Sequence, residues 1–209
     1  INETVTDVEI DKILKKVTKF ILSGLQGTNY PISYVEQNTI QDQYLKMVKG
    51  SDYSDKEPTS SDFIGPSSIT LQINNIAPIN TNTNIVNIRN DYTVTDKADG
   101  DRKMLYVAAT GKIYLITTLL SIEFTGAQTK NKDLFNSLLD GEHIKHNKTG
   151  QFINLYAAFD IYFINNKDIR SLKLVPLSPE VLPTNFRSPL LHNFIKTLPS
   201  AKLFSGFNE

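Results

Sequence analysis

The sequence predicts an α+β fold in which N-terminal helices precede a mostly antiparallel sheet. Apolar residues recur at helical spacing between residues 8 and 25. From residue 69 onward the pattern changes to short apolar runs separated by Asn, Gly and Asp turns, which is typical of antiparallel strands. The chain has 209 residues, of which 40% are hydrophobic and 21% charged, so it can bury one substantial core.

Two helices are predicted in residues 1–62. Thr6 and Glu9 have the spacing of a capping box, and the first helix should extend to about Leu25. The second should run over residues 39–49, with Gly50 ending it. Residues 51–62 are polar and include Pro58, which predicts a mobile loop. We therefore divide the chain into an N-terminal helical segment and loop, 1–62, and a sheet-bearing part, 63–209.

The sheet-bearing part is expected to contain short strands and one late helix. A proline-rich connector, 176–183, should separate the strands from a helix over 188–199. Ser188 would cap that helix, Pro189 would take its first position and Pro199 would end it. The predicted strands are residues 69–73, 91–95, 103–109, 112–117, 121–125, 138–145 and 155–165.

Composition excludes several classes of protein. No segment is long and apolar enough to cross a bilayer, so we expect no membrane partner. The absence of cysteine excludes disulfides and thiolate metal sites, and it is compatible with a reducing cytoplasm. Lys and Arg number 22, as do Asp and Glu, so a nucleic-acid enzyme of this composition would depend on a local basic patch.

The most specific pattern is K-x-D-G-x-R, formed by Lys97, Asp99, Gly100 and Arg102. Glycine lets the backbone turn tightly or approach a ligand. A lysine amine is nucleophilic only in its neutral form, which a neighbouring cation or partial desolvation favours. Arginine presents a planar fork of donors that suits a phosphate or a sugar hydroxyl. The alternative is a solvated turn whose charges only keep the chain soluble.

Two further motifs follow in a fixed order. Asp140-Gly141-Glu142 is the second, and an aromatic block over residues 156–162 that includes Phe159 is the third. The ordered set resembles the covalent nucleotidyltransferases. With residues 63–71, 111–116 and 159–170, it is similar to the guanylyltransferase domain of viral mRNA capping enzymes, particularly those of large cytoplasmic DNA viruses.

The resemblance implies a two-step reaction. Lys97 would attack the α-phosphate of GTP, release pyrophosphate and form a lysyl-N-GMP intermediate. The GMP would then pass to the 5′-diphosphate end of RNA. Arg102 would hold the ribose hydroxyls, and Asp99 would orient Lys97.

The same resemblance assigns the remaining site residues. Asp140 and Glu142 would lie near the ribose and a Mg²⁺ or Mn²⁺ ion, with Glu142 as the metal ligand. Phe159 would stack on the purine. Phe159 could instead be an ordinary core residue, and Glu142 a hairpin charge. His143-x-x-His146 is a weak metal candidate, because these side chains would point to opposite faces of a strand.

The later motifs of the family are missing. After Arg170 we find neither the Glu-Gly strand that binds metal nor the Lys-x-Lys strand that holds the triphosphate. We therefore expect a nucleotidyltransferase (ATP-grasp-like ligase/capping) domain that is incomplete at its C-terminus, a fragment of a longer enzyme without the OB-fold.

The implied partners are GTP, diphosphate-ended RNA, and RNA triphosphatase and methyltransferase domains or subunits, in the host cytoplasm (viral factory) or the virion. Two alternatives stay open. An ATP-dependent RNA or DNA ligase would use the same lysine chemistry with AMP, and a catalytically silent scaffold would retain only the fold.

Overall fold

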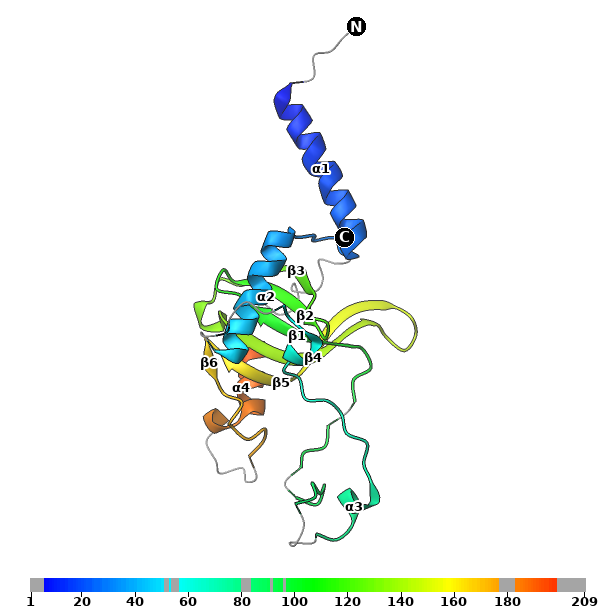
Figure 1. Ribbon diagram of the computed structural model, residues 1–209, viewed down its shortest axis with the longest axis vertical. Coiled ribbons are helices and arrows are strands. Elements are labelled where there is room, and N and C mark those ends of the chain that lie inside the picture. The colour runs from blue at the N-terminus through cyan, green and yellow to red at the C-terminus, as the bar shows by residue number, and fades with distance from the viewer. Residues whose placement is uncertain are drawn as a thin grey trace.

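A six-stranded antiparallel sheet forms the body of the protein (Figure 1). The computed structural model describes residues 6–50, 53, 57–79, 84–90, 92–95, 97–176 and 183–198. The strand order is β3-β2-β1-β4-β5-β6. The strands are β1 Asp101–Val107, β2 Lys112–Thr117, β3 Ile122–Gln128, β4 Ser137–His146, β5 Phe152–Ile164 and β6 Lys167–Asp168.

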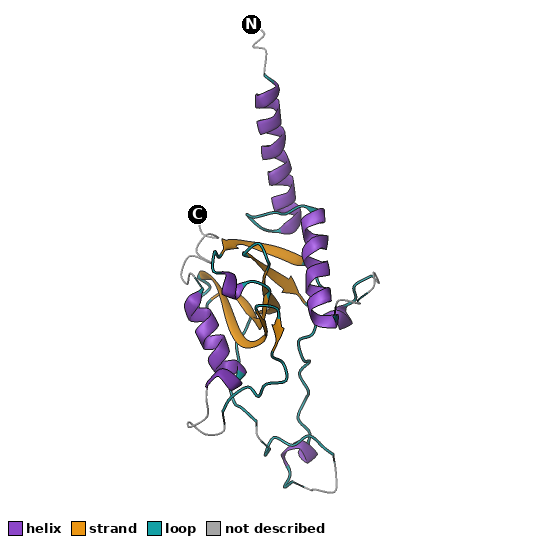
Figure 2. Ribbon diagram, turned by 90° about the vertical axis from the view of Figure 1, so that its left-hand side faces the viewer, coloured by secondary structure: helices purple, strands orange, loops and turns teal. Residues whose placement is uncertain are grey.

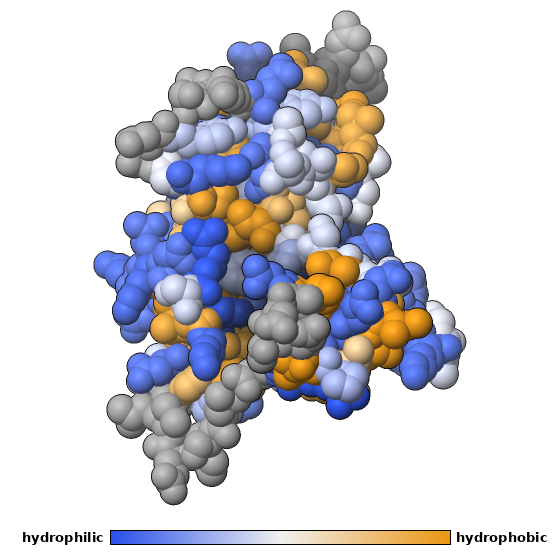
Figure 3. All heavy atoms as spheres, turned by 60° about the horizontal axis from the view of Figure 1, so that its bottom comes forward, coloured by the Kyte–Doolittle hydropathy of each residue, from blue (hydrophilic) through white to orange (hydrophobic). Residues whose placement is uncertain are grey.

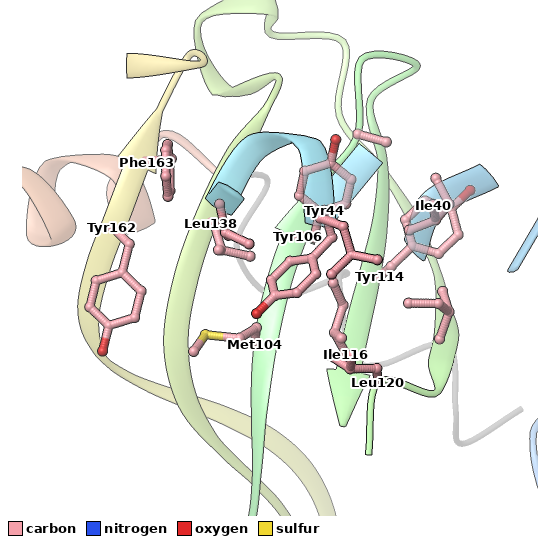
Figure 4. Close-up of a cluster of buried hydrophobic side chains, with 14 of the residues drawn as sticks. Ile40, Tyr44, Met104, Tyr106, Tyr114, Ile116, Leu120, Leu138, Tyr162 and Phe163 are labelled. Carbon is pink, nitrogen blue, oxygen red and sulfur yellow. The ribbon is translucent and has the colours of Figure 1, made fainter. Parts of the chain in front are cut away.

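One helix covers each face of this sheet (Figure 2). Helix α2, Tyr34–Lys49, packs on the face that contains Met104 and Tyr106 of β1. Helix α4, Arg187–Thr197, packs on the opposite face, where Leu105 and Val107 lie. Alternate β1 side chains therefore enter separate cores, as the two-residue period of a strand requires. Figure 4 shows the α2 side, where Tyr44 lies among the buried side chains of the sheet.

Helix α1, Asp7–Gln26, projects from the body (Figure 1). The predicted capping box between Thr6 and Glu9 is confirmed, and Gly27, with a φ of 60°, ends the helix in the left-handed conformation. None of its residues is buried, although one side of the helix is apolar. Among the described residues, no helix has the length and apolar character needed to cross a membrane.

Helix α2 begins at Tyr34, earlier than the predicted start near Thr39, and ends before Gly50 as predicted. Its start is set by Ser33, whose hydroxyl accepts a hydrogen bond from the Glu36 amide at 3.1 Å. Such a cap satisfies a donor that the first turn leaves without a helical partner. The sequence analysis had not recognised Ser33 as a cap.

Replacing Ser33 with alanine should therefore destabilise the protein by about 1 kcal/mol, because the Glu36 amide loses its acceptor. Equilibrium urea unfolding measures this free energy. The Ser33→Asp variant serves as a matched control, since a carboxylate can accept the same bond. Equal losses in both variants would contradict the capping role.

Five predicted strands are confirmed, with small shifts of their ends, and two are wrong. Residues 69–73 and 92–95 are not strands, and Asp91 lies outside the described residues. Ile69 and Ile73 are each 80% exposed, and residues Ile73–Ile76 form the short helix α3. Figure 3 turns this end of the molecule forward and shows hydrophobic side chains at the surface. β-Branched sequence alone does not make a strand when no neighbouring strand accepts its hydrogen bonds.

The last helix also begins differently from the prediction. Helix α4 starts at Arg187 after Phe186, so Ser188 lies inside the helix instead of capping it. The Arg187 guanidinium binds the Asp160 carboxylate, with Nε and Oδ1 2.8 Å apart, and donates to the Leu172 carbonyl. Residues 177–182 of the predicted connector and Pro199 lie outside the described residues. Short 3-10 turns complete the described elements: η1 Ser60–Asp62, η2 Lys132–Leu134 and η3 Pro183–Asn185.

Candidate nucleotide site

Residues from the second and third motifs lie beside Arg102 on the α2 face of the sheet. Arg102 of β1 is opposite Glu142 of β4, and Met104 is opposite Asp140. Residues that face each other across an antiparallel pair project to the same side. The β4–β5 register shifts between Asp140 and Gly141, and Phe159 reaches Arg102 from β5. We call this part of the sheet the Arg102 face.

Arg102 forms a two-pronged ion pair with Asp140. Its Nε lies 3.1 Å from Oδ1, and its Nη2 lies 2.5 Å from Oδ2. These hydrogen bonds raise the pKa of Arg102 above its ordinary value. The Asp140 side chain is 0% exposed. Its oxygens are thus occupied by protein donors, so the ribose and metal contacts implied for Asp140 stay predictions.

Two aromatic rings flank the Arg102 guanidinium. Its Cζ lies 5.8 Å from the ring centre of Phe63 and 5.7 Å from that of Phe159. Both distances are in the range of cation–π contacts. Phe159 is 40% exposed, so its alternative reading as a core residue is wrong. An exposed ring beside an arginine is available to a planar base.

Lys97 and Asp99 lie in the loop that enters β1, and both are open to solvent. The Lys97 side chain is 83% exposed, and its Nζ is 3.2 Å from the Ala98 carbonyl oxygen and 4.0 Å from Asp99 Oδ1. The predicted strand before Lys97 does not form. The structure therefore groups Arg102, Asp140 and Phe159, but records no contact between them and the Lys97 amine.

Gly100 joins the Lys97 loop to β4. Its amide donates to Glu142 Oε2 at 2.8 Å, which links the loop to β4. A Cβ on Gly100 would lie 2.7 Å from the His143 carbonyl oxygen, which is too close for any side chain. Glycine is thus required here because the backbone approaches β4. The role predicted from the sequence was a tight turn or a close approach to a ligand. The contact holds one end of the Lys97 loop beside Glu142.

The sequence matches a known protein family over most of its length. The family model for the mRNA capping enzyme catalytic domain matches residues 25–195, more than half of the chain. The chain belongs to this family. The match includes α2, so this helix is part of the capping-enzyme domain.

A viral capping enzyme is among the relatives of this domain. The "Probable mRNA-capping enzyme" of Acanthamoeba polyphaga mimivirus is 29% identical over 168 residues. The alignment covers 80% of this chain and 13% of that protein. The chain therefore spans a small part of the relative's length, and the predicted resemblance to viral capping enzymes is confirmed.

Glu142 is the candidate metal ligand of this capping-enzyme domain. Among the described residues, no three His, Cys, Asp or Glu side chains lie close enough together to hold an ion. Mg²⁺ is commonly bound by one or two carboxylates together with substrate phosphates, which Glu142 on the Arg102 face can satisfy. Glu142 thus fits the ion that the family implies.

His143 and His146 do not form a metal pair in the capping-enzyme domain. His143 is 6% exposed, and its Nε2 lies 2.6 Å from Asn154 Oδ1, whereas His146 is exposed. Burial lowers the pKa of His143, which keeps the ring neutral. The different burial of the two rings agrees with the expectation that they face opposite sides of the strand.

Two residues that contact the Arg102–Asp140 pair were not predicted from the sequence. Tyr162 donates its hydroxyl proton to Asp140 Oδ2 at 2.7 Å. The Pro66 carbonyl accepts a hydrogen bond from Arg102 Nη1. Both lie in segments that had been quoted for the family resemblance, but no local pattern indicates that either one reaches Arg102.

Proposed function

We propose that this capping-enzyme domain is an mRNA guanylyltransferase module that moves GMP from GTP, through Lys97, to the 5′-diphosphate end of RNA. The observation that supports it best is the Gly100–Glu142 hydrogen bond. That bond ties the loop of the nucleophile to the strand that faces Arg102. The exposed Lys97 thus lies on a loop that is tethered to the strand opposite Arg102.

The chemistry has two displacements at phosphorus. The neutral Lys97 Nζ attacks the α-phosphorus of GTP, so an N–P bond forms while the bond to the bridging oxygen breaks. Pyrophosphate leaves with that electron pair, and the nitrogen gives up one proton to solvent. A terminal oxygen of the RNA diphosphate then attacks the same phosphorus, the N–P bond breaks, and Nζ takes up a proton. A covalent intermediate divides one difficult transfer into two easier ones.

The other site residues would bind and orient the nucleotide. Arg102 would donate to the ribose hydroxyls, and exposed Phe159 would stack on the guanine. Asp99 would orient the Lys97 amine. Glu142 would hold Mg²⁺ or Mn²⁺, which neutralises phosphate charge when bound.

The wider setting follows from the same proposal. The RNA end must carry a diphosphate, so an RNA triphosphatase has to act first, and a methyltransferase would act on the cap afterwards. Because the match spans 13% of the mimivirus protein, further domains of a longer chain are a natural source of both. We propose the host cytoplasm or the virion as the location.

Intact mass spectrometry after incubation with MgCl₂ and either GTP or ATP tests this function. We expect the mass to increase by one GMP residue with GTP, and peptide mapping to place the adduct on Lys97. An AMP adduct formed in preference to GMP would instead support the ligase alternative. No adduct with either nucleotide would contradict the proposal for this chain and favour the silent scaffold.

A further inference from the structure

The buried hydroxyl of Tyr162 contacts the Arg102–Asp140 ion pair. It comes from β5 and is 6% exposed. Burial raises its pKa, and the neighbouring Asp140 carboxylate raises it further, so the hydroxyl stays protonated and donates. Asp140 Oδ2 thus accepts from both Tyr162 and Arg102 Nη2. Without the Tyr162 hydroxyl, the buried Asp140 carboxylate would lose one of the contacts that fix its orientation, and part of its hydrogen-bonding capacity would go unused.

A short strap, residues 63–66, contacts Arg102 from the opposite side. Its Pro66 carbonyl accepts from Arg102 Nη1. A Cβ on Gly65 would lie 2.9 Å from Arg102 Cζ, so the strap backbone passes directly against the guanidinium. Helix α2 anchors the strap, because the Tyr44 hydroxyl accepts from the Ile64 amide at 3.1 Å and donates to the Asp62 carbonyl at 3.0 Å.

These contacts use three of the five N–H donors of Arg102. Nε and Nη2 donate to Asp140, and Nη1 donates to Pro66. An arginine has five N–H groups in a fixed plane, so one remains on each Nη. The planar guanidinium recognises a ligand best when the orientation of the guanidinium is set before the ligand binds.

We propose that Tyr162 is a positioning residue, which acts through Asp140 to orient the two remaining Arg102 donors toward the nucleotide. The strap contacts the same guanidinium at Nη1 and so limits its movement. Nothing in this role requires Tyr162 to touch the nucleotide. The inference rests on the proposed guanylyltransferase function and assigns a task to a residue of the third motif for which the sequence indicated no separate role.

The test compares Tyr162→Phe with Tyr106→Phe. Both variants remove one buried hydroxyl from the core that α2 covers, but the Tyr106 hydroxyl bonds to Gln43 at 3.3 Å, away from Arg102. In the rate of adduct formation, we expect Tyr162→Phe to raise the KM for GTP about tenfold, the effect of weakening one charge-assisted hydrogen bond. The rate at saturating GTP should change little, and Tyr106→Phe should leave both values unchanged.

A double-mutant cycle shows whether the effect passes through Arg102. In an Arg102→Lys background, which keeps the cation but not the fork, Tyr162→Phe should have no further effect on KM. A measurement independent of activity is the NMR signal of the Arg102 Nε–H group, which should exchange faster with water in Tyr162→Phe than in Tyr106→Phe.

Each outcome bears on a separate claim. Equal KM values for Tyr162→Phe and the wild type, or an equal Nε–H signal, would overturn the positioning role. A KM effect of the same size in the Arg102→Lys background would do so too. If the wild type forms no adduct at all, the proposed function fails first, and this inference falls with it.

Discussion

The Lys97→Ala variant is expected to lose the GMP adduct, with a fall in rate of roughly four orders of magnitude or more, as when other covalent nucleophiles are removed. The reason is that the next lysine along the chain, Lys103, cannot replace it. Lys103 is 4% exposed and pairs with Glu123 at 2.6 Å. As the immediate neighbour of Arg102 on a strand, Lys103 also faces the other side of the sheet.

Two controls separate nucleophilicity from charge. Lys97→Arg keeps a cation at the same position, but its guanidinium stays protonated and cannot attack, so it should be as inactive as Lys97→Ala. Lys148→Ala removes a different exposed lysine, in the β4–β5 turn, and should form the adduct like the wild type. A GMP adduct on Lys97→Ala, measured by intact mass, would disprove the role of Lys97.

The Asp140→Ala variant is expected to lower the free energy of unfolding by about 3–5 kcal/mol, the usual cost of breaking a buried ion pair by removing one partner. Asp140 is fully buried, and the paired Arg102 side chain is 26% exposed. Without the carboxylate, Arg102 loses two hydrogen bonds and the buried Tyr162 hydroxyl loses its acceptor. Equilibrium urea unfolding measures the loss.

Asp168→Ala is the matched control for this prediction. Asp168 also pairs with an arginine, Arg170, at 2.6 Å, but the two side chains are 46% and 40% exposed. Water screens such a pair, so its removal should cost at most about 1 kcal/mol. Similar losses in the two variants would show that burial does not determine the stability of the Arg102–Asp140 pair.

Local patterns in the sequence were sufficient for much of the fold. The capping box at Thr6 and the apolar spacing after it predicted α1, and Gly50 marked the end of α2. The strands that became β1 to β5 were predicted because each one alternates or concentrates apolar residues between turn residues. Such signals act over a few residues, so they can be read without the tertiary structure.

The three ordered motifs also predicted the family, which the comparisons confirm. The individual roles of Lys97, Asp99, Arg102, Glu142 and Phe159 remain predictions. The structure adds that Phe159 is exposed and that Glu142 accepts a hydrogen bond from Gly100.

Contacts between distant residues were decided only by the tertiary structure. The failed strand at residues 69–73 has strand-like composition but pairs with no strand of the sheet. Arg102 meets Asp140 because β1 and β4 align in one register, and it meets Phe159 through the irregular β4–β5 pairing. Tyr162 and the strap reach the same guanidinium from other parts of the chain.

The sequence by itself thus determined α1, the end of α2, the strands β1 to β5 and the family. The tertiary structure alone decided that Asp140 holds Arg102 and that Tyr162 and Pro66 join them. The physical reason is that strand register, bulges and backbone approach arise from the packing of the whole sheet, so residues far apart in the chain give no local sign that they will meet.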